Sequence, residues 1–97
     1  MLSKLKEAET RYEQIMQKLS LPETVSDKGL YKALMKEQKM LSPIIEKYRE
    51  YLSAERQISD AKELISESDD AEMRKFAEDE LKDAKALSEK LLEELKI

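Results

Sequence analysis

Apolar residues recur at alternating spacings of three and four along three stretches of the chain, a pattern typical of amphipathic helices. The first stretch predicts a helix over residues 2–20, with an apolar stripe formed by Met1, Leu5, Ala8, Tyr12, Ile15 and Leu19. The segment SLPETVSDKG then interrupts the pattern. Pro22 lacks an amide hydrogen, and Ser26 followed by Asp27 is typical of a helix start. We therefore expect a loop at residues 21–26.

The second stretch predicts a long helix over residues 27–66 that contains a proline. Its stripe consists of Leu30, Leu34, Leu41, Ile44, Tyr48, Tyr51, Ile58 and Ile65. The stripe keeps its register through Pro43, which favours one helix that bends there. Ser42 and Pro43 together are also typical of an N-cap followed by the first residue of a new helix. The middle helix is therefore expected to be kinked or broken near Pro43.

The third stretch begins after SESDD, where Asp69 with Glu72 three residues later resembles a capping box. It predicts a helix over residues 69–96, with a stripe of Met73, Ala77, Leu81, Ala84, Ser88, Leu91 and Leu95. Short connections place successive helices antiparallel. The expected fold is all-α: one domain over residues 1–97, an elongated antiparallel three-helix bundle with coiled-coil-like packing. The rings expected in the core or at its edge are Tyr12, Tyr48, Tyr51 and Phe76.

Composition narrows the chemistry of the chain. One glycine, two prolines and 41% charged residues in 97 positions are typical of long helices with short connections. The chain has no histidine, cysteine or tryptophan, so the usual general base, thiol nucleophile and soft metal ligands are missing. We expect no catalytic role, no cofactor and no metal site. Adjacent acids such as Asp69 and Asp70 are expected to cap helices or face water, because neighbouring helical residues do not share a face.

No apolar run approaches the roughly 18 residues that span a bilayer, which predicts a soluble, cytoplasmic chain. The net charge of −4 is uneven: residues 1–65 hold 12 basic and 11 acidic side chains, and residues 66–97 hold 6 and 11. The acidic end would repel phosphates, so any nucleic-acid contact should be local.

One basic row stands out on the middle helix. Lys28, Lys32, Lys36 and Lys39 fall within a sector of about 80° on a helix with 100° per residue, nearly opposite the leucine stripe. We call these four residues the lysine ridge. It is interpreted either as the solvated back of an amphipathic helix or as a line of contacts for RNA phosphates or another partner.

Two segments resemble the N-terminal domain of bacterial class I peptide chain release factors. Within that family, they are most similar to the release factor 1 branch. These are YKALMKEQKMLSPIIEKYREYL and DDAEMRKFAEDELKDAKALSEKLLEEL. The resemblance is strongest at Leu41-Ser42-Pro43-Ile44 and from Asp70 to Met73, and it extends over essentially the whole chain. Many relatives carry a proline where this chain has Asp70, a difference that affects only how the last helix starts.

The resemblance implies a domain that contributes to translation termination without performing its chemistry. The family's catalytic Gly-Gly-Gln does not occur in this sequence. Pro22-Glu23-Thr24 has the spelling of the codon-reading tripeptide, but it lies between two predicted helices and is interpreted as coincidence. The chain is therefore expected to be a domain fragment that ends at Ile97, near where the family passes into its codon-reading domain.

The partners implied by the resemblance are ribosomal. The family's first domain lies toward the stalk base and the rRNA of the GTPase-associated centre, and it is linked to the class II release-factor GTPase. No membrane partner is expected, and the isolated fragment should be a monomer or a weak dimer. Two alternatives stay open: a coiled-coil arm that binds tRNA or rRNA, and a purely structural helical module.

Overall fold

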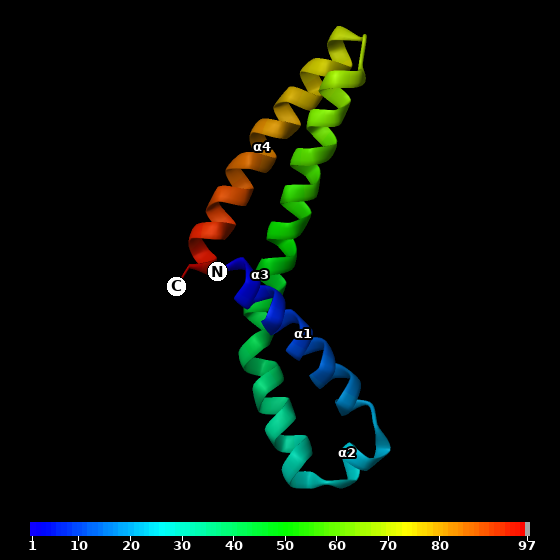
Figure 1. Ribbon diagram of the computed structural model, residues 1–97, viewed down its shortest axis with the longest axis vertical. Coiled ribbons are helices and arrows are strands. Elements are labelled where there is room, and N and C mark those ends of the chain that lie inside the picture. The colour runs from blue at the N-terminus through cyan, green and yellow to red at the C-terminus, as the bar shows by residue number, and fades with distance from the viewer. Residues whose placement is uncertain (97) are drawn as a thin grey trace. The chain divides into compact units, whose positions relative to one another are not determined.

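The computed structural model describes residues 1–96, which form four helices and no strand (Figure 1). They are α1 (Leu2–Leu19), α2 (Pro22–Ser26), α3 (Lys28–Glu67) and α4 (Ala71–Leu95). The predicted all-α class is confirmed. The last position of the predicted domain, Ile97, lies outside the described residues. None of the helices in residues 1–96 is long and apolar enough to cross a membrane.

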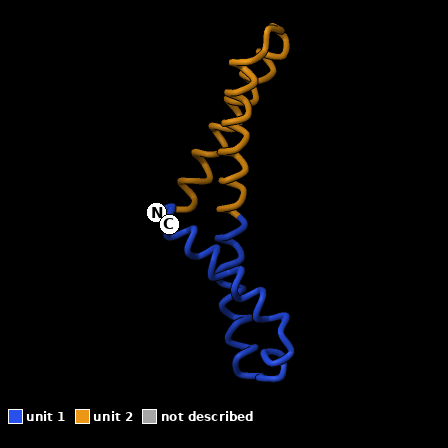
Figure 2. The backbone as a smooth tube through the Cα atoms, turned by 45° about the vertical axis from the view of Figure 1, so that its right-hand side comes forward, with its two compact units in different colours: residues 1–46 blue, residues 47–97 orange. Residues whose placement is uncertain are grey.

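The chain divides into two compact units, residues 1–46 and residues 47–97 (Figure 2). Unit 1 contains α1, α2 and the first part of α3, with α1 antiparallel to α3. Its core includes Leu5, Ile15, Leu34 and Ile45, each at most 9% exposed. Ile15 and Ile45 are the largest side chains that are fully buried.

Unit 2 is an antiparallel pair formed by the second part of α3 and by α4. Many of its buried side chains are small: Ala54, Ala61, Ala77, Ala84 and Ser88. Small side chains at a helix–helix contact let the two backbones come close. Tyr48, Tyr51 and Leu91 supply larger buried surfaces in this unit.

The helix α3 runs through Pro43 without interruption. A proline inside a helix removes one backbone hydrogen bond, here to the carbonyl of Lys39. Pro43 and Lys39 are both exposed residues, so the missing bond lies on the solvent side of α3. Because α3 is continuous from Lys28 to Glu67, the prediction of one long helix is confirmed, and no new helix begins at Ser42.

The segment predicted as a loop at residues 21–26 contains the short helix α2. Pro22 is its first residue, where the missing amide hydrogen is not needed. Thr24, in the middle of α2, is only 3% exposed. The proline that signalled a loop thus begins a helical turn, and Thr24 of the Pro-Glu-Thr tripeptide packs inside unit 1.

Candidate functional site

The lysine ridge lies on α3 within unit 1. All four of its residues are exposed, whereas Leu34 on the other side of the helix is 4% exposed. Within residues 1–96 no ion pair engages any of the four amines. From Lys28 to Lys39 the row extends about 16 Å, at 1.5 Å per residue. The structure therefore places the four predicted residues together as a row of unneutralised positive charge.

Asp27 sets where this row begins. Its carboxylate Oδ1 accepts a hydrogen bond from the backbone N–H of Leu30 at 3.1 Å, and its carbonyl accepts one from Tyr31 at 2.9 Å. This is the geometry of an N-cap, which satisfies amides that the first turn leaves free. Lys28 is consequently the first helical residue of α3, and the first turn contains no acid.

An ion pair connects the two long helices of unit 1. Arg11 on α1 donates through Nε to Glu37 Oε2 at 2.7 Å and through Nη2 to Glu37 Oε1 at 2.8 Å. This hydrogen bonding holds the pKa of the Glu37 carboxyl below its ordinary value and raises the pKa of Arg11. Two parallel bonds fix orientation as well as distance. The pair therefore helps to set which face of α3 turns away from α1.

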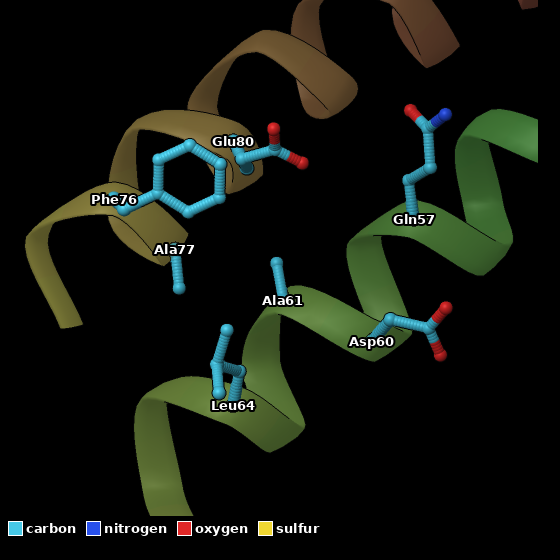
Figure 3. Close-up of a pocket in the computed structure, with 7 residues that line it drawn as sticks. All are labelled: Gln57, Asp60, Ala61, Leu64, Phe76, Ala77 and Glu80. Carbon is cyan, nitrogen blue, oxygen red and sulfur yellow. The ribbon is translucent and has the colours of Figure 1, made fainter. Parts of the chain in front are cut away.

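Unit 2 contains an open depression between α3 and α4, about 160 Å³ in volume (Figure 3). Ala61 and Ala77 point into it from the two helices, and the ring of Phe76 stands at its edge. Phe76 is 58% exposed, so its predicted place in or at the edge of the core is wrong. Position 76 falls beside the α4 stripe, and the short side chain of Ala77 occupies the inward position instead.

The acidic residues of α4 do not assemble into a metal site. Asp70 caps the helix, with Oδ1 accepting the N–H of Glu72 at 2.9 Å, so the cap is one residue later than the predicted Asp69. No three carboxylates within residues 1–96 are placed to hold a metal ion.

The lysine ridge and the depression beside Phe76 differ in how far the sequence predicts them. The lysine ridge could be recognised from sequence because charge repeats at helical spacing. The depression beside Phe76 could not, because its outline depends on how α4 is rotated against α3. A large ring beside Ala77, one of the small residues of the α4 stripe, is the sequence signal that could have indicated it.

Comparison with known proteins finds similar sequences over the whole chain. The PCRF domain model matches residues 8–97. Peptide chain release factor 1 of Agathobacter rectalis is 41% identical over 97 residues, and those of Bacillus licheniformis and Bacillus subtilis are 39% and 38% identical over the same length. Each alignment covers 100% of this chain and 27% of the relative, so the chain spans about a quarter of the length of these proteins. No solved structure matches.

The resemblance to class I release factors is confirmed by these matches. Since the family model covers all but the first seven residues, the chain belongs to the PCRF domain family.

Proposed function

We propose that this chain serves as the N-terminal domain of a translation termination factor of the release factor 1 type. Its role is to dock on the bacterial ribosome near the stalk base and the GTPase-associated centre, in the cytoplasm. Stop-codon reading and peptide release belong to other parts of such a factor. The observation that carries the proposal is the family match over residues 8–97, combined with the exposed lysine ridge on α3.

The position of the ridge supports a contact with phosphates. Helix N-termini carry partial positive charge, and basic side chains in the first turns add to it. Lys28, in the first turn, therefore weakens the start of α3 electrostatically rather than stabilising it. Because the Asp27 carboxylate already caps the first amides, the positive potential that a phosphate could meet comes from the lysine side chains along the ridge. A purely structural helix would gain more from an acid at position 28.

The charge of the rest of the chain limits where rRNA could bind. Residues 66–97 carry 11 acids against 6 bases, which disfavours phosphates. Contact with rRNA should therefore be confined to the ridge and should weaken steeply with added salt. The class II release-factor GTPase is a second proposed partner, supported by the family resemblance alone.

Sedimentation of the chain with bacterial ribosomes at increasing salt tests the docking surface. Lys32→Glu with Lys36→Glu should weaken binding by about tenfold or more, with helicity and melting temperature unchanged, because both side chains are exposed. The matched control is Lys75→Glu with Lys82→Glu, an equal charge change at exposed positions of α4. Equal weakening by both pairs would reject the ridge as a specific contact.

A chimera tests the termination role separately. The chain replaces the matching segment of Bacillus subtilis release factor 1, to which it is 38% identical. We expect stop-codon-dependent peptide release from the chimera. A folded chimera that binds ribosomes but releases no peptide would contradict the proposal.

The ridge also favours one alternative, an arm that binds tRNA. Tight, salt-sensitive binding of tRNA by the chain, together with an inactive chimera, would support that role. Binding to neither tRNA nor ribosomes would support a purely structural module instead.

A further inference from the structure

A second surface, in unit 2, consists of two adjoining depressions between α3 and α4. The first is the one beside Phe76, and the second, of about 200 Å³, is bordered by Asp83, Ala84 and Leu87. Both are lined by Gln57 and Glu80. They therefore adjoin, and we call the two together the α3–α4 groove. None of the lysine-ridge residues belongs to it.

Exposed apolar side chains mark the two ends of this groove. Phe76 is 58% exposed and Leu87 is 42% exposed. Eleven positions separate them on α4, which brings them back to the same face at a distance of about 16 Å along the axis. Between them the floor is formed by the buried methyl groups of Ala61, Ala77 and Ala84. A large exposed ring above a floor of small side chains gains contacts only when another molecule covers it.

The middle of the groove is acidic. Glu80 and Asp83 lie between the two apolar ends, and Asp60 borders the groove from α3 (Figure 3). Within residues 1–96 these three carboxylates form no ion pair. Their charges therefore remain available to a basic partner.

We propose that the α3–α4 groove binds a basic amphipathic helix of a partner protein. Such a helix would place two apolar side chains about 16 Å apart, or three turns, over Phe76 and Leu87. Lysine or arginine side chains between them would pair with Glu80 and Asp83. This surface is separate from the lysine ridge, and the inference holds whether or not the chain acts in termination.

Charge decides against two other occupants. The phosphates of a nucleic acid would be repelled by the carboxylates in the middle of the groove. A second copy of the chain, related by a twofold axis, would set the same patch against itself. Glu80 and Asp83 would then face identical acids, at a cost that a basic helix avoids.

The test measures fluorescence anisotropy of a labelled synthetic helix of about 18 residues, or five turns. The peptide has two leucines eleven positions apart with lysines between them. Glu80→Lys with Asp83→Lys should weaken its binding to the chain by about tenfold or more, and so should Phe76→Ala. The control is Glu78→Lys with Glu89→Lys, the same charge change on the opposite side of α4. It should alter affinity by less than about threefold.

A charge-swapped peptide, with glutamates in place of the lysines, should bind the Glu80→Lys, Asp83→Lys variant better than it binds the parent. Because Phe76 is exposed, Phe76→Ala should keep the parent's melting temperature. Equal weakening by the groove and control variants would overturn the proposal, as would unchanged affinity for Phe76→Ala. Sedimentation as a dimer that Phe76→Ala dissociates would also overturn it, since the groove would then belong to a second copy.

Discussion

Arg11 and Glu37, 26 positions apart in the chain, form a bidentate ion pair between α1 and α3, with nitrogen–oxygen distances of 2.7 and 2.8 Å. Glu37 interrupts the apolar stripe of α3, and its pairing with Arg11 accounts for a carboxylate at that position. The two side chains remain partly exposed, at 39% and 38%. We therefore expect the pair to fix the register of α1 against α3 and to add little to the free energy of unfolding.

This pair predicts a pH dependence of stability. The pKa of Glu37 is lower in the folded chain than in the unfolded chain, chiefly because Arg11 donates hydrogen bonds to it. A carboxyl with a lowered pKa stabilises the fold above its unfolded pKa, about 4.3, and that contribution is lost as the pH falls through the folded value. Glu37→Gln should therefore flatten the fall in melting temperature at acid pH.

The matched control is Glu46→Gln, an exposed carboxyl on the same helix. Thermal unfolding of both variants and the parent, followed by circular dichroism from neutral to acid pH, makes the comparison. If Glu37→Gln and Glu46→Gln change the fall in melting temperature at acid pH equally, the ion pair with Arg11 is not the source of that pH dependence.

Two neighbouring isoleucines predict opposite effects of the same substitution. Ile45 is 1% exposed and Ile44 is 44% exposed. Ile45→Ala removes buried methyl groups and leaves a cavity, so it should lower the free energy of unfolding by about 2 to 5 kcal/mol. Ile44→Ala should change it by about 0.5 kcal/mol or less. Urea denaturation measures both free energies of unfolding. Similar losses for the two variants would contradict the burial of Ile45 and the exposure of Ile44.

The amino-acid pattern predicts the helical class and the long middle helix, but the inward side of each helix only in part. In α3 the spacing places Ile44 in the stripe, whereas the structure buries Ile45 and leaves Ile44 exposed. Two identical adjacent residues give no local reason to choose between them. The choice is made by packing, because Ile45 continues the face of Leu41 and Tyr48 at spacings of four and three.

Polar residues within the stripes also show that the pattern of one helix does not predict contacts with another. Glu55 occupies a position on the apolar side of α3, where it meets Ser88 of α4, whose Oγ donates to Glu55 Oε1 at 2.7 Å. Ser88 is 33 positions away, and no pattern within either helix predicts that the two meet. The lysine ridge was predictable because it belongs to one helix. The groove beside Phe76 is lined by both α3 and α4, so it depends on their register and cannot be predicted from either helix alone.

The start of α4 gives a third prediction. Asp70 accepts the N–H of Glu72 at 2.9 Å, and the exposed neighbour Asp69 is not the cap. Asp70→Ala should destabilise the chain by about 0.5 to 2 kcal/mol, because an amide of the first turn loses its acceptor. Asp70→Asn should retain most of the stability, and Asp69→Ala should cost less than Asp70→Ala. An Asp69→Ala variant that unfolds more easily than Asp70→Ala would place the cap at the earlier residue.

Tyr51 predicts a loss of stability at alkaline pH. It is 7% exposed, and burial raises the pKa of its hydroxyl, with a further contribution from a hydrogen bond with Glu55. A group whose pKa is raised on folding contributes fully below its unfolded pKa, about 10 for tyrosine, and that contribution is lost as the pH rises through the folded value. Tyr51→Phe should therefore reduce the alkaline fall in unfolding free energy and remove a late step from the tyrosinate absorbance titration. Tyr31→Phe, at an exposed position, serves as the control and should leave that late step in place. A late step that survives Tyr51→Phe would have to come from another ring, and the network of Tyr51, Glu55 and Ser88 would not be its source.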